Sequence, residues 1–221
     1  MADCSANMHA IKEYLAATSS GHSIEIREFG LVDYAVSLQA MHDFALNRDK
    51  QQRDQIWLLQ HPAVYTQGTS CNQQPLIPSD IPLVKTDRGG QITYHGPGQI
   101  VMYPLLNIRR YKMGVKVFVE KIEQAVIDML EQHSIRARNR QDAPGVYVDD
   151  AKIAALGLRI RRGNSYHGLS LNVDMDLSPF ANIDPCGYQG LEVTQISDQM
   201  DRPSDMGSIS DALLRSFLAL I

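Results

Sequence analysis

Apolar residues recur along this chain with two periods, one typical of helices and one typical of strands. Helical spacing predicts amphipathic helices over residues 32–47, 115–133 and 209–221. Alternation or short apolar runs predict strands over residues 23–29, 55–60, 92–95, 100–103, 146–148, 152–160 and 166–173. Helices and strands mixed along one chain indicate the α/β fold class.

Short turns connect several of the predicted strands. The glycine–proline–glycine turn at residues 96–98 predicts a hairpin that joins residues 92–95 to a returning strand at 100–103. The three strands predicted between residues 146 and 173 are separated only by polar turns, which predicts an antiparallel meander.

The length and the N-terminal composition suggest how the chain is divided. A chain of 221 residues favours one domain, and we expect residues 22–221 to form it. Residues 1–21 are polar and small, and they end in Ser19, Ser20 and Gly21. We therefore expect residues 1–21 to be a flexible N-terminal extension.

Charge and cysteine content narrow the class of protein. A formal charge of −4 argues against a nucleic-acid-binding protein held by phosphate contacts. No apolar run is long enough for a membrane span, and the first 20 residues show no targeting pattern, so we expect a cytoplasmic protein. Cys4, Cys71 and Cys186 are too few and too scattered for a disulfide framework, so we expect reduced thiols.

A glycine-rich run at residues 88–99 is the most informative segment. Its glycines let backbone N–H groups approach a ligand closely, and Arg88 and His95 place a cation and an imidazole near its ends. Such a surface suits a head group derived from a carboxyl group. The alternative is a tight hairpin whose glycines serve only the turn geometry.

One cysteine lies in a context that favours reactivity. Cys186 lies between Pro185 and Gly187, so we expect it on a turn with space for an incoming group. The alternative is a small buried side chain that fills a corner. A reactive cysteine needs a nearby base or cation to form its thiolate, and the candidates are His61, His95, His167 and Lys152.

Small residues mark two of the predicted strands. Lys152 opens an otherwise apolar strand, either pointing into a cavity or lying solvated beside a turn. Gly157 and Gly168 inside strands indicate either a slot for an extended apolar chain or a bulge. No pair of cysteines or histidines has the spacing of a zinc site, and no nucleotide-binding motif is present. Three basic clusters near residues 109–116, 136–140 and 159–162 suit an acidic protein partner or simple solvation.

Taken together, several motifs in order resemble the octanoyl-[acyl-carrier-protein]:protein N-octanoyltransferase family of lipoate biosynthesis. The resemblance covers about residues 24–200. It rests on the run 88–99, on residues 142–148, on Lys152 and Ile153, and on the segments 157–160, 167–169, 172–180 and 185–187. It implies a mixed, mainly antiparallel sheet with packed helices, similar to the catalytic domain of biotin and lipoate protein ligases.

The resemblance also implies a site. Cys186 corresponds to the family's acyl-thioester nucleophile and Lys152 to its partner lysine. The acyl-binding segments correspond to Arg88, Gly89, Gly90, Gln91, Ile92, Thr93, Tyr94, His95, Ala155, Leu156, Gly157, Gly168, Leu169 and Ser170. No metal and no cofactor is implied.

The implied reaction is a double displacement. Octanoyl-acyl carrier protein is the donor, and the acceptors are apo lipoyl domains of 2-oxoacid dehydrogenase E2 subunits and the glycine-cleavage H protein. We expect a monomer with no nucleic-acid or membrane partner. Three alternatives remain: an ATP-dependent lipoate or biotin ligase, an acyl-thioester hydrolase that admits water, and a non-catalytic module that binds acyl carrier or lipoyl domains.

Overall fold

The computed structural model describes residues 8–49, 51–70, 79–183, 192–201 and 205–221. Within these residues, eight strands form one sheet in the order β1-β2-β3-β7-β11-β10-β9-β8. They are β1 (Lys12–Ala17), β2 (Ser23–Leu31), β3 (Gln55–Gln60), β7 (Gln99–Leu105), β11 (Asn164–Asn172), β10 (Ala151–Arg161), β9 (Val146–Val148) and β8 (Arg138–Asn139). Neighbours are antiparallel except β2 and β3, which confirms the expected mixed, mainly antiparallel sheet.

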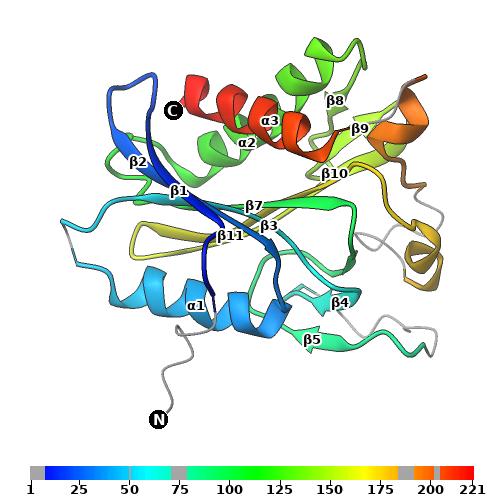
Figure 1. The fold of residues 1–221 in the computed structure, drawn as a ribbon, viewed down its shortest axis with the longest axis horizontal. Helices are drawn as coiled ribbons and strands as arrows, with labels where there is room; N and C mark the ends of the chain where they lie inside the picture. Colours follow the sequence, from blue (N-terminus) through cyan, green and yellow to red (C-terminus); the bar gives the residue numbers. More distant parts are fainter. Residues whose placement is uncertain (1–7, 50, 71–78, 184–191, 202–204) are drawn as a thin grey trace.

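A smaller sheet and three α-helices complete the described fold. The smaller sheet has the order β5-β4-β6, with β5 (Leu83–Lys85), β4 (Val64–Gln67) and β6 (Ile92–His95). The helices are α1 (Tyr34–Asn47), α2 (Val115–Gln132) and α3 (Met206–Leu220), with short 3-10 helices η2 (Ser178–Asn182) and η4 (Ile196–Gln199). In Figure 1, α2 and α3 lie together on one side of the large sheet, and α1 and the small sheet lie on the other.

Side-chain alternation assigns the apolar residues of the large sheet to these two sides. Ile56 of β3 packs in a cluster with Phe118 of α2 and Phe217 of α3. The next residue, Trp57, packs with Met41 of α1 on the opposite face. Because successive strand side chains point to opposite faces, a strand covered on both sides is apolar throughout, as residues 55–60 predict.

The helices occur where the periodicity predicts them. α1 begins after Asp33, whose carboxylate accepts hydrogen bonds from two amides of the first helical turn. Asp205 caps α3 in the same way. Each capping carboxylate satisfies N–H groups that have no partner inside the helix. The meander of β9, β10 and β11 is also confirmed.

The hairpin predicted for residues 92–103 is wrong. β6 pairs with β4 in the small sheet, whereas β7 pairs with β3 and β11 in the large sheet. The turn between them carries the chain from one sheet to the other. Gly98, at a φ of +87°, donates its N–H to Gln60 Oε1 at 2.8 Å and accepts from the amide of Asp174 at 3.0 Å. A Cβ there would lie 1.9 Å from the Asp174 carbonyl oxygen.

The N-terminal extension also differs from the expectation where it is described. Residues Lys12–Ala17 form β1, which pairs with β2 over six residues and covers its open edge. Ser19 then donates its hydroxyl to the carbonyl of Ile221 at 2.7 Å, which ties this segment to the end of α3. Residues 12–20 are therefore part of the fold, and residues 1–7 lie outside the described residues.

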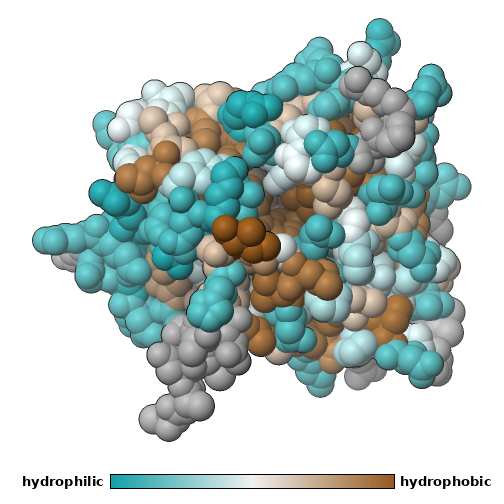
Figure 2. All heavy atoms as spheres, viewed as in Figure 1, coloured by the Kyte–Doolittle hydropathy of each residue, from teal (hydrophilic) through white to brown (hydrophobic). Residues whose placement is uncertain are grey.

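Apolar side chains reach the surface beside this edge strand. Figure 2 shows them at the centre of the visible face, over the start of β1. Ile11 and Leu15 are among the most exposed large apolar residues, at 78% and 56%. No helix among the described residues has the length and apolar character that crossing a membrane requires.

Candidate functional site

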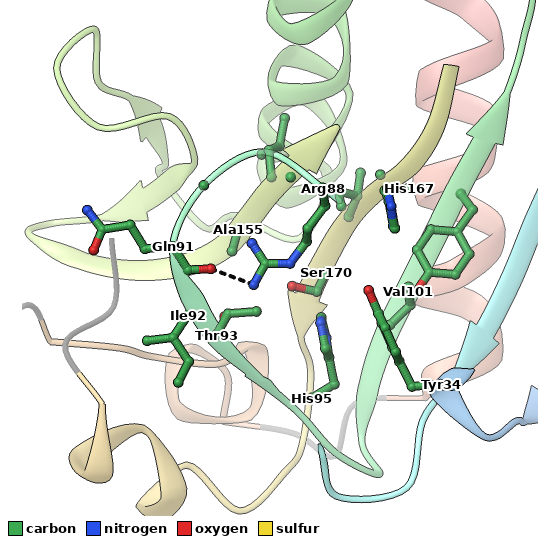
Figure 3. A pocket seen from close by; sticks show the side chains of 16 residues that line it. Tyr34, Arg88, Gln91, Ile92, Thr93, His95, Val101, Ala155, His167 and Ser170 are labelled. Carbon is green, nitrogen blue, oxygen red and sulfur yellow. Dashed lines mark hydrogen bonds between the residues drawn. The ribbon is translucent and has the colours of Figure 1, made fainter. Parts of the chain in front are cut away.

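A pocket lies on the α1 side of the large sheet, where β10 and β11 face β6 and the loop before it (Figure 3). Twelve of the fourteen residues predicted to bind the acyl group line it: Arg88, Gly90, Gln91, Ile92, Thr93, His95, Ala155, Leu156, Gly157, Gly168, Leu169 and Ser170. Three segments far apart in the sequence thus meet at one cavity.

Small residues on paired strands form one wall of the pocket. Gly157 of β10 lies opposite Gly168 of β11, and Ala155 lies opposite Ser170. The pairing is continuous through both glycines, so neither marks a bulge. Gly157 instead admits the Arg88 loop, because a Cβ there would lie 3.0 Å from Arg88 Cδ.

The other two predicted residues, Gly89 and Tyr94, do not line the pocket. Gly89 donates its N–H to the carbonyl of Leu158 at 3.1 Å and so holds the loop on β10. Tyr94 lies between Thr93 and His95 on β6, and its ring packs with Phe180 at a centroid distance of 5.4 Å. Strand alternation therefore places Tyr94 on the opposite face from its two pocket-lining neighbours.

Arg88 holds the loop together with its guanidinium. Nη2 donates to the carbonyls of Thr66 and Gln91 at 2.6 and 2.7 Å, and Nη1 donates to the carbonyl of Gly89 at 2.9 Å. Nε donates to the Thr66 hydroxyl at 3.1 Å. The sequence suggested a cation for a head group, whereas these contacts give Arg88 the role of shaping the pocket wall. The fork of a guanidinium suits this divergent set of acceptors.

His95 lies in the pocket as a neutral imidazole. Burial, followed by the neighbouring imidazole of His61, lowers the pKa of His95 to about 3. Its Nδ1 lies 2.7 Å from Gln99 Oε1, and Gln99 Nε2 donates to Asn172 Oδ1 at 2.9 Å. The amide orientation of Gln99 therefore places the imidazole hydrogen on Nδ1 and leaves Nε2 as an acceptor 3.4 Å from the hydroxyl of Thr66.

The sequence did not single out Tyr34, Val101 and Tyr103, which also line the pocket. The Tyr34 ring stacks over His95 with an interplanar angle of 14°. Tyr34 is the first residue of α1, and Tyr103 lies near the end of β7. No local sequence motif connects either residue to the glycine-rich run. Only helix-on-sheet packing brings them there.

His167 enters the pocket from β11 with an unusual backbone conformation. Its φ is +58°, a left-handed value that is rare for a residue with a side chain. His167 Nε2 lies 2.9 Å from Asp87 Oδ1, and the preceding residue, Tyr166, donates its hydroxyl to Asp87 Oδ2 at 2.6 Å. The hydrogen bond from His167 holds the pKa of the Asp87 carboxyl well below its usual range.

A third side chain, His42, also contacts the Asp87 carboxylate. His42 of α1 lies 3.1 Å from the same oxygen of Asp87, and the ligating atoms of His42, Asp87 and His167 lie within 4.8 Å of one another. Two imidazoles and a carboxylate are a metal-binding set. In this structure both imidazoles contact the same Asp87 oxygen at hydrogen-bond distance.

Lys152 lies on β10 three residues before Ala155 and is 3% exposed. Its Nζ donates to the carbonyl of Pro144 at 3.1 Å and lies 5.1 Å above the ring of Tyr147. The solvated alternative is therefore excluded. Its backbone N–H donates to the carbonyl of Glu192 at 2.8 Å, and its carbonyl accepts from Thr194 at 3.0 Å.

Cys186 lies outside the described residues, as do Cys4 and Cys71. The described chain ends before it at Ile183 and resumes at Glu192. Val193 forms a parallel bridge with Lys152, so the segment that follows Cys186 in the sequence runs alongside the predicted partner lysine.

The fold places the protein in a known structural class. It is similar to lipoate-protein ligase A bound with ATP, with a TM-score of 0.69, 16% identity and coverage of 88% of this chain and 83% of that one. It is also similar to the biotin protein ligase from Aquifex aeolicus, with a TM-score of 0.51, 10% identity and coverage of 87% and 66%. The protein thus has the fold of lipoate and biotin protein ligases.

The sequence comparisons define the family. Residues 33–218 match the Lipoyl protein ligase A/B catalytic domain. The chain is 53% identical to an octanoyltransferase from Hahella chejuensis, covering 91% of this chain and 90% of its relative. It is 52% identical to an octanoyltransferase from Stutzerimonas stutzeri, covering 87% and 88%. The chain belongs to the octanoyltransferases of the lipoyl protein ligase A/B catalytic-domain family.

Proposed function

We propose that the protein transfers an octanoyl group from octanoyl-acyl carrier protein, through a thioester on Cys186, to a lysine ε-amine of lipoyl domains. The observation that carries this proposal is the position of Lys152. Lys152 is buried and lies on the same strand as the pocket residue Ala155. Its backbone forms hydrogen bonds with Glu192 and Thr194, which follow Cys186 in the sequence. The octanoyltransferase relatives support the acyl group and the reaction class.

The pocket between β6, β10 and β11 is the proposed acyl site. Its paired small residues leave space for an alkyl chain above the sheet, and the apolar side chains of Ile92, Val101 and Leu169 also line it. Burial of the chain there removes apolar surface from water, worth about 0.8 kcal/mol per CH₂. It also keeps water from the thioester, whose hydrolysis is the competing loss.

In the first half-reaction, Lys152 accepts the proton of the Cys186 thiol. The resulting thiolate attacks the thioester carbonyl carbon of the donor, so a bond to Cys186 forms and the bond to the phosphopantetheine sulfur breaks. The Lys152 ammonium returns the proton to that leaving sulfur. Burial of Lys152 disfavours the charged ammonium and so makes the amine available as a base.

In the second half-reaction, the acceptor lysine attacks the acyl carbon and an amide forms as the bond to Cys186 breaks. Lys152 removes the proton that the attacking amine must lose, and the Cys186 thiolate regains it. The first step exchanges one thioester for another, and the second converts a thioester into a more stable amide, so the proposal needs no ATP, cofactor or metal. We propose apo lipoyl domains of 2-oxoacid dehydrogenase E2 subunits and the glycine-cleavage H protein as acceptors, and a cytoplasmic monomer as the working form.

Intact mass spectrometry after mixing the protein with octanoyl-acyl carrier protein, without ATP, tests this proposal. We expect one octanoyl adduct that disappears when apo lipoyl domain is added. Cys186→Ser should form no adduct, while the matched variant Cys71→Ser should form it at the wild-type rate.

Two other results would replace the proposal. Release of free octanoate at the same rate with and without acceptor indicates an acyl-thioester hydrolase. Octanoylation that requires free octanoate and ATP indicates a ligase, the activity in the name of the structural neighbour bound with ATP.

A further inference from the structure

One peptide group connects Lys152 to a buried carboxylate. Lys152 Nζ donates to the carbonyl oxygen of Pro144 at 3.1 Å. The N–H of the same peptide group belongs to Gly145, and it donates to Glu123 Oε1 at 2.9 Å. The amine and the carboxylate therefore bond to opposite ends of one peptide group.

Glu123 lies in an unusual place for a carboxylate. It is on the buried side of α2, between Ile122 and the core residue Ala125, and is 5% exposed. Its second oxygen, Oε2, accepts from the side-chain amide of Asn139 at 3.1 Å. Among the described residues, no lysine or arginine forms a salt bridge with Glu123. Burying a carboxylate without a paired cation is costly, so we expect a function for Glu123 in its hydrogen bond to Gly145.

The turn that carries the peptide group is built around the lysine side chain. Gly145 has a φ of +142°, which side chains rarely tolerate. A Cβ at Gly145 would lie 3.0 Å from Lys152 Cε and 2.8 Å from the carbonyl oxygen of Ala154. Glycine thus leaves room for the Lys152 side chain beside this peptide group, and the hydrogen bond from Gly145 to Glu123 helps to fix the direction in which the Pro144 carbonyl points.

We propose that Glu123 is a positioning residue for the Lys152 amine and acts through the Pro144–Gly145 peptide group. The inference rests on the proposed role of Lys152 as the proton carrier. A carbonyl only accepts hydrogen bonds, so it takes one N–H of Lys152 in both the ammonium and the neutral form. The lone pair of the neutral amine is then directed away from Pro144.

The negative charge of Glu123 also acts on the balance between the two forms. It polarises the peptide group and strengthens the carbonyl as an acceptor, which favours the ammonium. The ring of Tyr147, 5.1 Å from Nζ, acts in the same direction. Burial of Lys152 opposes both, because a buried ammonium loses its hydration.

The variant Glu123→Gln tests this inference in the full-length protein. Glutamine retains one oxygen as the acceptor for Gly145 and removes the charge, and its Nε2 replaces the oxygen that accepts from Asn139, so the Asn139 amide must rotate to present its own oxygen. The matched control is Glu120→Gln, the same change one turn earlier on α2, at an exposed side chain that pairs with Lys116. The readout is the ¹⁵Nζ signal of Lys152 followed by NMR against pH, assigned by its loss in Lys152→Arg.

We expect Glu123→Gln to lower the midpoint of the Lys152 titration by about one pH unit. The acidic limb of the pH–rate profile for octanoyl transfer should move by the same amount, with a several-fold lower plateau because the base is weaker. Glu123→Asp, which restores the charge, should recover most of both effects. Glu120→Gln should change neither.

An unchanged Lys152 midpoint in Glu123→Gln overturns the inference, as does an equal shift in Glu120→Gln. The variant Lys152→Ala tests the proposed function independently of the coupling between Glu123 and Lys152. If Lys152→Ala still transfers octanoyl groups while the midpoint moves in Glu123→Gln, the coupling stands and the catalytic role of Lys152 fails. If Lys152→Ala is inactive and the midpoint does not move, the role of Lys152 stands and the coupling fails.

Discussion

Gly168 of β11 lies against the backbone of β7, so closely that a Cβ on it would be 2.0 Å from the carbonyl oxygen of Met102. Its cross-strand partner Gly157 is less restricted, with the nearest atoms to such a Cβ at 3.0 and 3.1 Å. The two glycines share one wall of the pocket, but one is required by the sheet and the other by the Arg88 loop.

The two glycines should therefore differ in what a methyl group costs. Gly168→Ala must displace backbone, and we expect a loss of about 3 to 5 kcal/mol in the free energy of unfolding. Gly157→Ala meets Arg88 Cδ at 3.0 Å and the Gly89 carbonyl oxygen at 3.1 Å, which need to shift only slightly, so it should cost about 1 kcal/mol while reducing octanoyl transfer. Urea unfolding measures both, with Gly114→Ala as the control because nothing lies within 4 Å of its Cβ position. Equal losses for the two pocket glycines would contradict this account.

Two buried neutral histidines should make stability depend on pH. Burial lowers the pKa of His61 to about 4, and the pKa of His95 is about 3. Between about pH 6.5 and pH 4 the unfolded chain binds protons that these folded imidazoles do not, so stability falls as pH falls. The slope should reach about 1.4 kcal/mol per pH unit for each histidine.

Urea unfolding at a series of pH values measures that slope. His95→Gln should lower the slope by up to about 1.4 kcal/mol per pH unit in the stated window, and His9→Gln, at an exposed side chain, should leave it unchanged. A slope that stays the same without His95 would show that the stability loss comes from other groups.

The Arg88 contacts predict that a lysine cannot replace this arginine. Arg88→Lys keeps the charge but cannot reach the carbonyls of Thr66, Gly89 and Gln91 together. We expect a loss of about 2 to 3 kcal/mol in the free energy of unfolding. The KM for octanoyl-acyl carrier protein should rise because the loop that forms the pocket wall is released. Arg159→Lys, at an exposed position on β10, is the control and should behave as wild type.

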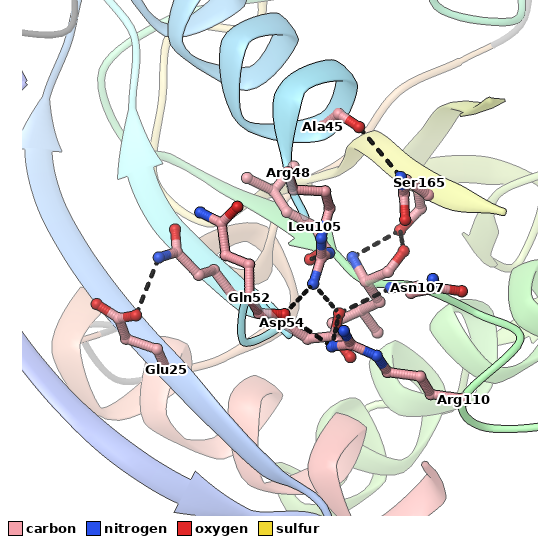
Figure 4. Close-up of polar contacts among 12 residues, drawn as sticks. Glu25, Ala45, Arg48, Gln52, Asp54, Leu105, Asn107, Arg110 and Ser165 are labelled. Atoms are coloured by element: carbon pink, nitrogen blue, oxygen red, sulfur yellow. Dashed lines mark hydrogen bonds and ion pairs between the residues drawn. The ribbon is translucent and has the colours of Figure 1, made fainter. Parts of the chain in front are cut away.

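A buried ion pair away from the pocket should contribute more to stability than an exposed one. Asp54 binds Arg48 at 2.7 Å and Arg110 at 3.2 Å, with the side chains of Asp54 and Arg48 each 2% exposed (Figure 4). Asp54→Ala leaves the buried guanidinium of Arg48 uncompensated and should cost about 3 to 5 kcal/mol in the free energy of unfolding.

The exposed pair Arg138 and Asp150 supplies the comparison. Its side chains are 59% and 87% exposed, so Asp150→Ala should cost less than about 1 kcal/mol. Thermal and urea unfolding of the two alanine variants measure the difference. Similar losses would show that burial does not set the strength of these ion pairs.

Most of the elements were predictable because their signals are local. Residues 55–60 are apolar on both faces and form β3 with the expected bounds, and the helical stripe at 115–133 forms α2 almost to the residue. The pairing of strands was harder. Residues 92–95 and 100–103 are strands as predicted, but the turn between them joins two sheets, since alternation identifies a strand without identifying its partner.

The pocket shows the same division. Its glycine-rich run and its small strand residues were predicted from motifs, since backbone approach leaves a mark on residue size. Tyr34 and Glu123 carry no such mark, because an aromatic residue at a helix start and a glutamate on an amphipathic helix are ordinary in sequence. Tyr34 reaches the pocket, and Glu123 reaches Gly145, only because α1 and α2 pack against the rest of the fold.

Local periodicity was enough to predict the helices and most strands, and the resemblance of several ordered motifs to a known family implied the pocket segments. The tertiary structure decided which strands pair, that β1 covers the sheet edge, and that Lys152 faces Pro144 with Glu123 behind the same peptide group. The physical reason is the sequence separation over which each kind of interaction acts. Alternation and turn chemistry act between residues a few positions apart, whereas the contacts around Lys152 join residues that only chain packing brings together.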